Sequence, residues 1–281
     1  MPAFSNQYLA VPAEEYDGKL FAINPEWYLG ADGIMSVPIS ENRIFWKFGD
    51  TLLGQIVDGK RSIKEMPRNT IAIQDISEGL PGKVDWYWNA ENGKPSSFFR
   101  IHDDVSQMWF WPGTAFMHQG CLFLLGYGIV PADYEIESMS FDIKQPWIII
   151  VENPHEHPHR WRIRDRALSQ NHPGRFYCSA HFFEHDYLYL TGFHCPEPGM
   201  FSAMNTIMGR VKIETLFHTD WELKIESKNE SGKWVIDPAD AVTIFHPAVT
   251  ESSIYHDQPR NRFLATTYIP SSPDLLISQA S

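Results

Sequence analysis

The stretch WFWPGTAFMHQGCLFLLGYG, residues 109–128, has the pattern of a β-hairpin. Two runs rich in aromatic and apolar residues flank Gln119-Gly120, a two-residue pair of the kind that closes tight hairpins. Three other segments repeat this design of a strand, a short polar turn and a second apolar strand. They are residues 32–51, with strands at 33–39 and 44–49; 178–193, turning near His185-Asp186; and 251–268, turning around Pro259. Long runs with helical periodicity are scarce, so the sequence predicts an all-β protein.

The four hairpins recur at similar intervals. They begin at Asp32, Trp111, Cys178 and Glu251, which are 79, 67 and 73 residues apart. Such spacing, filled by further short strands, is typical of a β-propeller with long insertions in its blades. We therefore expect residues 1–281 to form a single propeller domain with blade hairpins near 32–51, 111–128, 178–193 and 251–268. A β-sandwich is the alternative fold, but it explains the recurrent hairpins less well.

The chain shows four blade-like units, and only 13 residues follow Tyr268. A last blade is therefore expected to be truncated or irregular, and we favour a chain that stops short of it. The length of 281 residues is otherwise enough to bury a full core.

Composition narrows the classes of partner. The chain carries 35 acidic and 23 basic residues, for a formal net charge of −12, which repels phosphate backbones and disfavours nucleic acid. Aromatic residues make up 14%, with ten Trp, and a few of them are available for stacking on sugar rings once the core is filled. No apolar run reaches the length of a membrane span, so no membrane partner is expected. The oligomeric state stays open.

The cysteines and the N-terminus are the features of the sequence that indicate a cellular compartment. Three cysteines without metal-type spacing, Cys121, Cys178 and Cys195, predict free and mostly buried thiols. The first 18 residues lack a basic region followed by an apolar one, so no signal peptide is visible. The cytoplasm is the default expectation, and secretion stays open.

The register of the first hairpin brings two carboxylates together. If Ile39 pairs with Ile44, Gly33 faces Asp50, and Asp32 and Asp50 become diagonal neighbours with Cβ atoms about 7 Å apart. The same counting sets the partners at the open ends of the other hairpins: Trp111 with Gly128, Cys178 with Phe193, and Glu251 with Thr267. Because equivalent hairpins of a propeller open on one face, Asp32, Asp50 and Glu251 should converge, with Trp111 and His181 nearby.

Clustered carboxylates repel one another, so at least one should have a raised pKa. Glycoside hydrolysis uses a protonated carboxyl group beside an ionised one. We assign Asp32 as base or nucleophile, Glu251 as general acid, and Asp50 as the residue that holds or tunes the site. Ordinary turn chemistry of Asp at strand ends is the alternative explanation.

These residues resemble the five-bladed β-propeller glycoside hydrolases, the arabinanase, β-xylosidase and levansucrase-like group. The similarity runs from about Trp27 to Tyr268, and it is greatest to bacterial propeller families that include endo-D-arabinanases. It is carried by GADGIMSV at 30–37, IFWKFGDT at 44–51, RNTIAI at 68–73, the hairpin at 109–126, and TESSIYHD with RNRFLATTY at 250–268. The resemblance implies that Asp32 is the catalytic Asp that opens the first blade, Asp50 a second functional Asp, and Glu251 the general acid. The fifth blade of that group is not visible here.

Four further residues are candidates for binding substrate. Arg68 and Asn69 precede a strand and could hydrogen-bond sugar hydroxyls, with loop anchoring as the alternative. Trp111 could stack on a sugar ring. His181 is expected on an inner strand, where a hydrogen-bonded core role is the alternative.

The sequence therefore predicts a glycoside hydrolase acting on a furanose-containing or related polysaccharide. A non-catalytic glycan-binding propeller is one alternative, and a glycosyltransferase or phosphorylase on the same scaffold is another. No phosphate loop, G-x-S-x-G elbow or H-E-x-x-H helix occurs, which disfavours kinases, esterases and metalloproteases.

No organic cofactor is expected. A metal ion on the propeller axis is compatible with the sequence but is not predicted. The alternating His155, His157 and His159 could bind a transition metal, although the neighbouring prolines favour an exposed loop.

Overall fold

The computed structural model describes residues 20–102, 107–133, 140–168, 174–195, 204–217, 224–236, 240–244, 250–268 and 275–280. The first 18 residues, searched for a signal peptide, lie outside this part. The all-β prediction is confirmed, because the described elements are strands together with short 3₁₀ helices. The 3₁₀ helices are η2 (Pro158–Arg160), η3 (Ile213–Phe217) and η4 (Gln258–Arg260).

Four antiparallel sheets follow one another along the chain. The first contains β2 (Met35–Ser40), β3 (Arg43–Phe48), β6 (Thr70–Asp75) and β7 (Lys83–Tyr87). The second contains β10 (Trp109–His118), β11 (Cys121–Pro131), β12 (Phe141–Val151) and β13 (Ile163–Ala167). The third contains β14 (Arg175–Glu184), β15 (Tyr187–His194), β16 (Asn205–Lys212), β17 (Glu226–Lys228) and β18 (Trp234–Ile236). The fourth contains β19 (Ser253–Asp257), β20 (Arg262–Tyr268) and β21 (Leu275–Ala280).

Each sheet begins with one of the predicted hairpins, and the turns lie where the sequence placed them. The second hairpin turns at Gln119-Gly120, where both residues have positive φ, 46° and 76°, as a tight hairpin turn requires. The third turns at His185-Asp186, between β14 and β15, and the fourth turns through η4. These turns were predictable because each depends only on residues adjacent in sequence.

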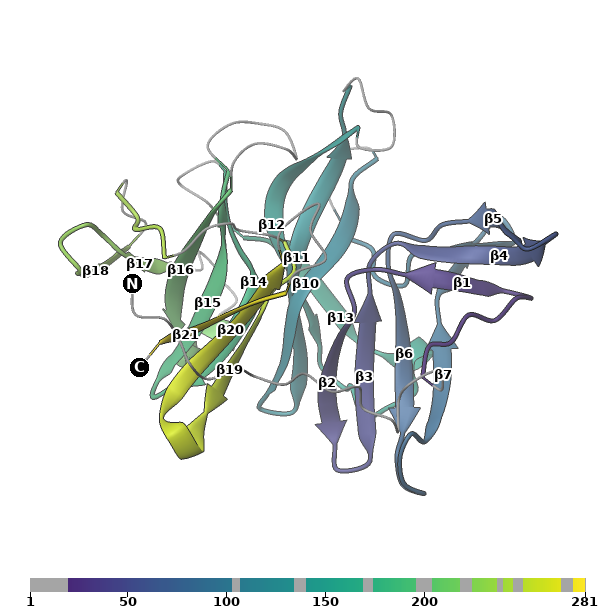
Figure 1. Ribbon diagram of the computed structural model, residues 1–281, viewed down its shortest axis with the longest axis horizontal. Coiled ribbons are helices and arrows are strands. Elements are labelled where there is room, and N and C mark those ends of the chain that lie inside the picture. Colours follow the sequence, from purple (N-terminus) through teal and green to yellow (C-terminus); the bar gives the residue numbers. More distant parts are fainter. Residues whose placement is uncertain are drawn as a thin grey trace.

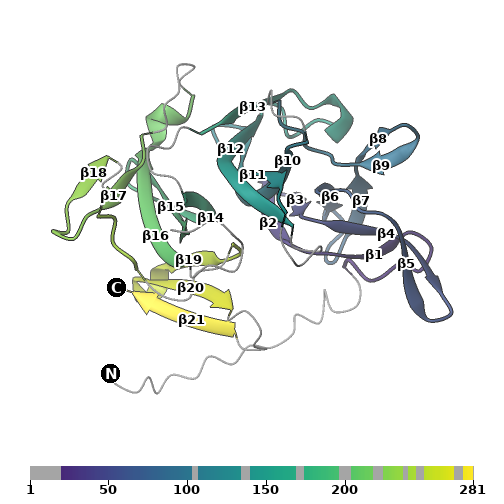
Figure 2. The same cartoon turned by 90° about the horizontal axis from the view of Figure 1, so that it is seen from above.

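A further sheet was not foreseen from the sequence. It consists of β1 (Tyr28–Ala31), β4 (Thr51–Val57) and β5 (Lys60–Glu65), and it lies to the right of β2 and β3 in Figure 1, beside the upper end of the first sheet. A small ribbon of β8 (Asn89–Glu91) and β9 (Lys94–Ser96) lies beside it (Figure 2). The apolar run after Asp50 therefore does not extend the first hairpin but pairs in another sheet.

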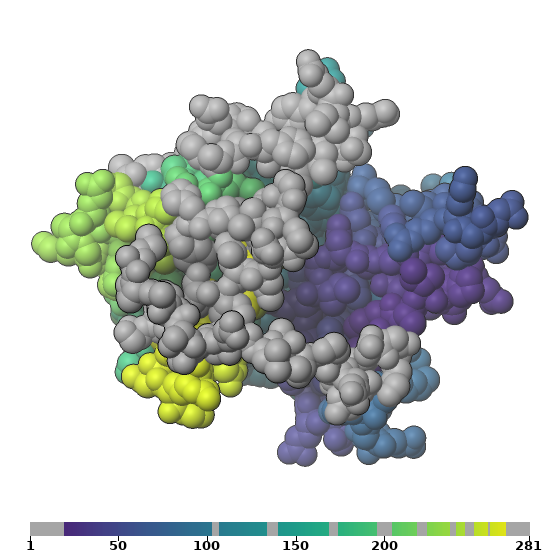
Figure 3. Space-filling view, viewed as in Figure 1, coloured from purple at the N-terminus to yellow at the C-terminus, as the bar shows by residue number. Residues whose placement is uncertain are grey.

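The first strands of the four sheets pack in sequence order, β2 against β10, β10 against β14, and β14 against β19. Seen from above, the sheets spread as an arc (Figure 2), and Figure 3 shows the N-terminal sheets on one side of the molecule and the C-terminal sheets on the other. In the described part of the chain no comparable packing joins β19 back to β2, so a closed five-bladed ring is not confirmed.

The apolar cores lie between neighbouring sheets. Between the first and second sheets they include Phe45 and Phe110, and between the second and third sheets Phe123 and Phe193, all with at most 1% of their surface exposed. Burying such aromatic faces is the main favourable term that fixes one sheet against the next. All three cysteines are free thiols; Cys178 is buried, whereas Cys121 and Cys195 are only half-buried. Among the described residues no helix is long and apolar enough to span a membrane.

The predicted registers of the second and third hairpins hold near the turns and fail toward the open ends, whereas those of the first and fourth fail close to the turn. In the first hairpin the register shifts between Pro38 and Ser40, so Pro38 rather than Ile39 pairs with Ile44. In the second it shifts between Pro112 and Ala115, and Trp111 faces Tyr127, not Gly128.

The third and fourth hairpins differ as well. The third shifts between Phe176 and Ala180, and Phe176 rather than Cys178 pairs with Phe193. In the fourth the register differs by one residue from the turn onward: Ser253 pairs with Thr266, and Glu251 precedes the strand instead of pairing with Thr267. In the first three hairpins the register shift adds at least one residue to one strand, which counting from the turn cannot detect.

Candidate functional site

The chain crosses three times between the sheet of β1, β4 and β5 and the first hairpin sheet. The crossings are the links at 32–34, 49–50 and 66–69, which join β1 to β2, β3 to β4, and β5 to β6. Asp32, Asp50 and Arg68 each lie in one of these links. The change of sheet therefore places two acids and one base at the same edge.

Asp32 and Asp50 lie directly opposite each other. The amide of Asp32 donates to the carbonyl oxygen of Asp50 at 3.2 Å, and the amide of Gly49 donates to the carbonyl oxygen of Asp32 at 2.9 Å. The predicted diagonal arrangement is therefore wrong by one residue, because of the bulge in β2. A Cβ at position 49 would overlap Oδ1 of Asp32, so a larger residue there must displace that carboxyl group.

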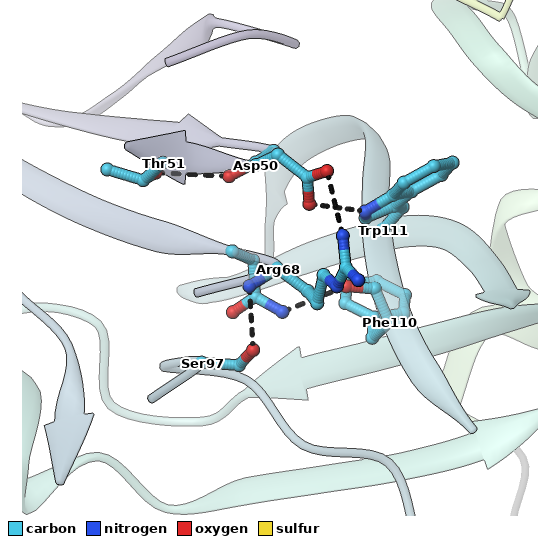
Figure 4. Close-up of polar contacts among 8 residues, drawn as sticks. Asp50, Thr51, Arg68, Ser97, Phe110 and Trp111 are labelled. Atoms are coloured by element: carbon cyan, nitrogen blue, oxygen red, sulfur yellow. Dashed lines mark hydrogen bonds and ion pairs between the residues drawn. The ribbon is translucent and has the colours of Figure 1, made fainter. Parts of the chain in front are cut away.

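Asp50 is held by two donors from different parts of the chain (Figure 4). Its Oδ1 accepts a hydrogen bond of 3.0 Å from the indole Nε1 of Trp111, and its Oδ2 accepts one of 3.1 Å from Arg68 Nη1. The Arg68 guanidinium also lies 4.8 Å over the ring of Trp109, and its backbone amide donates to Ser97 Oγ. Burial raises the pKa of Asp50, while Trp111 and Arg68 act in the opposite direction by stabilising the anion.

Asp32 has the largest perturbation among these carboxyl groups. Desolvation raises its pKa to about 6, and the negative charges of Asp50 and Glu251 add to the effect. Lys47 and the hydrogen bond at Asp50 lower the pKa, but they do not cancel the rise. Part of Asp32 remains open to solvent, so a proton can reach it.

Glu251 reaches the same centre from the segment that precedes β19. Its charge acts on both Asp32 and Lys47, and its Oε2 accepts a hydrogen bond of 2.8 Å from the hydroxyl of Thr250. The hydroxyl of buried Tyr127 donates to the carbonyl oxygen of Thr250 at 3.4 Å, which ties this segment to β11. The structure thus brings Asp32, Asp50 and Glu251 together, and their catalytic roles stay a prediction.

Trp111 lies beside the carboxylates, but one flank of its ring is already covered. The ring of Phe141 meets it edge to face, with centroids 4.6 Å apart. Its established contact is the hydrogen bond to Asp50, and stacking on a sugar stays a prediction.

Asn69 does not belong to a binding surface. Its side chain is fully buried and bridges the backbone: Nδ2 donates to the carbonyl oxygens of Phe99 and Phe110, and Oδ1 accepts from the amide of Phe99. The expected contact with sugar hydroxyls is therefore corrected to loop anchoring, the alternative interpretation of the sequence.

His181 lies on β14, where its Nδ1 is 2.6 Å from Thr114 Oγ1 and its ring packs against Phe116. Burial lowers its pKa to about 4, so the imidazole is neutral at ordinary pH. No hydrogen bond or ion pair joins it to the three carboxylates in the described part of the chain, which favours the core role over substrate binding.

The histidines of the loop before β13 are exposed, and His157 and His159 pack against Tyr87. Among the described residues no group of three or more His, Cys, Asp or Glu is arranged to hold a metal ion.

Sequence reasoning missed Lys47 and Tyr127. Lys47 is 4% exposed, lies on β3 two residues after buried Phe45, and therefore points to the same inner face. A lysine in phase with buried aromatic residues was the available signal. Tyr127 carried no such signal, because a tyrosine in an apolar strand is ordinary core composition.

Comparison with known proteins adds the family. A family described as a domain of unknown function, DUF5005, matches residues 14–280. The chain belongs to this family. No curated protein matches the sequence significantly.

Two solved structures of related fold are informative. One is a Bacteroides ovatus protein described as a "putative hydrolase": it is 17% identical, the match covers 100% of this chain and 74% of that one, and the TM-score is 0.66. The other is a Dyadobacter fermentans protein of unknown function, 10% identical, with 92% and 67% of the two chains covered and a TM-score of 0.51. At these identities the similarity shows a shared fold. The description of the Bacteroides protein as a hydrolase applies to that protein and names no substrate.

Proposed function

We propose that this DUF5005 protein is a glycoside hydrolase acting on a furanose-containing or related polysaccharide by carboxylate acid–base catalysis. The observation that carries the proposal is the pair Asp32 and Asp50, opposite each other in unlike environments. Asp50 is fixed by Trp111 and Arg68, whereas the pKa of Asp32 is raised to about 6. Cleavage of a glycosidic bond uses two carboxyl groups with different pKa values, one protonated and one ionised.

The electrostatics favour an exchange of the roles expected from the sequence. A general acid must hold its proton near the working pH, and Asp32 is the carboxyl with the pKa of about 6. Asp32 is then the acid that protonates the leaving oxygen, and Glu251, exposed at the open rim, is the base or nucleophile. Asp50, with both oxygens engaged, is the fixed anion that tunes Asp32.

The scaffold proposed for this chemistry is an incomplete five-bladed propeller. Support comes from the first strands of the four sheets, which pack side by side in chain order. The carboxylates arrive from both ends of this series, Asp32 beside β2 and Glu251 beside β19. Asp32 and Glu251 could contact the same substrate only if the arc of sheets curves around it.

The test uses the single variants Asp32→Asn, Asp50→Asn and Glu251→Gln against arabinan, xylan and fructan oligosaccharides. We expect each variant to lose 10²-fold or more of the wild-type rate, the usual scale for a general acid or base. Asp58→Asn, in the exposed turn after β4, is the matched control and should retain full activity. Unimpaired turnover by all three site variants of an active wild type would refute the proposal.

The same variants separate the roles. With an aryl glycoside, whose leaving group needs no help from an acid, an acid variant keeps most of its rate of bond cleavage, whereas a base or nucleophile variant does not. We expect the first behaviour for Asp32→Asn and the second for Glu251→Gln. Oligosaccharide binding without reducing-end release would instead indicate a glycan-binding protein, and phosphate-dependent release of a sugar phosphate would indicate a phosphorylase.

A further inference from the structure

We propose that Lys47 is a positioning residue of the site, the buried cation that holds the carboxylates of Asp32 and Glu251 at one centre while anchored on the carbonyl oxygen of Pro112. The role of these carboxylates in hydrolysis rests on the proposed function, but the electrostatic role of Lys47 does not.

The anchoring of Lys47 joins two sheets. The side chain leaves β3 in the first sheet and its Nζ donates a hydrogen bond of 2.8 Å to Pro112 O on β10 of the second. Only 4% of the residue is exposed, so the ammonium has lost nearly all of its water. A buried ammonium is costly unless opposite charge compensates it, and one neutral carbonyl is not enough.

The compensating charge comes from two distant segments. Glu251 and Asp32 both act on Lys47 and favour its charged form. Nζ also lies beside the residue that follows Asp32, since a Cβ built on Gly33 would be 3.9 Å from it. Burial nevertheless lowers the pKa of Lys47 to about 8, which leaves the ammonium protonated at neutral pH.

Two further titratable groups in the described part of the chain interact with these carboxylates. Asp50 raises the proton affinity of Asp32, and Tyr127 on β11 faces the charge of Glu251. Arg68, another cation at these carboxylates, is engaged with Asp50. Lys47 is thus placed to keep Asp32 from binding its proton too tightly to release.

The test is a titration of the Asp32 carboxyl carbon by NMR in the wild type and in Lys47→Met, which keeps the length of the side chain and removes the charge. Loss of this cation should raise the pKa of Asp32, because Lys47 favours the ionised carboxylate. Lys64→Met, an exposed lysine on β5, is the matched control and should leave it unchanged. An Asp32 pKa that is the same in Lys47→Met and in the wild type would overturn the inference.

A second measurement covers the case in which Lys47→Met does not fold. Glu251 is exposed, so Glu251→Gln should fold, and the pKa of Lys47 can be followed through its side-chain NMR signals. We expect that pKa to fall below about 8 in this variant, and an unchanged value would overturn the inference. Neither titration requires turnover, so a protein that hydrolyses nothing would refute the proposed function and still decide the role of Lys47.

Discussion

Asp32 and Asp50 stand face to face across two links that carry the chain from one sheet to another, with the Asp32 amide 3.2 Å from the Asp50 carbonyl oxygen. The surroundings of the two acids differ. Asp50 receives hydrogen bonds from Trp111 and Arg68, and Asp32 is left with the raised pKa. The difference between the two acids is therefore a property of the protein around them, and it can be measured.

The first prediction concerns stability and pH. The pKa of Asp32 is about 6 in the folded protein and about 3.9 when unfolded, so the folded state binds the proton more tightly. The stability that this proton contributes is present below about pH 4 and is lost as the pH rises through about 6. Asp32→Asn removes this loss, so its Tm relative to the wild type should increase by about 2 °C or more between pH 4 and pH 7.5.

Calorimetry at the two pH values checks this prediction. Asp58→Asn, in the exposed turn after β4, is the control, and its Tm difference from the wild type should be the same at both values. A pH-independent difference for Asp32→Asn would show that the pKa of Asp32 is not raised in the folded state.

The second prediction concerns the hydrogen bond from Trp111. Trp111→Phe keeps a ring against Phe141 and removes the Nε1 donor to Asp50. Because a hydrogen bond to a charged group contributes about 1.5–3 kcal/mol, the pKa of Asp50 should rise by about 1 unit or more, as measured by carboxyl NMR. Trp46→Phe removes an equivalent indole hydrogen bond, to Gln74, and serves as the control. Equal Asp50 pKa values in the two variants would contradict the assignment.

The third prediction concerns the glycine of the FGDT element. A Cβ at position 49 would overlap Oδ1 of Asp32, so Gly49→Ala must displace that carboxyl group. If the proposed function is right, activity should fall about 10-fold or more while circular dichroism stays that of the wild type. Gly93→Asn, in the β8–β9 turn where nothing lies near the added atom, should keep its activity. Full activity of Gly49→Ala would show that the position of Asp32 is not critical.

The sequence was sufficient for features that are local. Strand runs and turns such as Gln119-Gly120 depend on adjacent residues, and all four hairpins were predictable from them. Register was not, because the bulge that begins after Pro112 depends on how β10 packs between its neighbours. The crossing at Asp50 was hidden for a similar reason, since the apolar run of β4 looks like an extension of β3 until its partner β1 is known.

The site was partly predictable on the same grounds. The convergence of Asp32, Asp50 and Glu251 follows from repetition of one hairpin design, which survives errors of one residue in register. Lys47 was missed because a lysine in a strand is ordinarily assigned to the solvent face. Its phase with buried Phe45 was the available signal, whereas the carboxylates that act on it come from distant segments, which no local pattern brings together.

The last prediction separates anchoring from binding at Asn69. Its fully buried amide makes three hydrogen bonds to the backbone of Phe99 and Phe110. Asn69→Ala would leave the amide of Phe99 and the carbonyl oxygens of Phe99 and Phe110 without this partner. Each buried group left unsatisfied costs about 1–3 kcal/mol. We expect the free energy of unfolding, from urea titration, to fall by about 2–4 kcal/mol. Asn42→Ala, in the exposed β2–β3 turn, should change it by less than about 0.5 kcal/mol. A stable Asn69→Ala protein with weakened oligosaccharide binding would instead restore the substrate-contact interpretation that the structure has replaced.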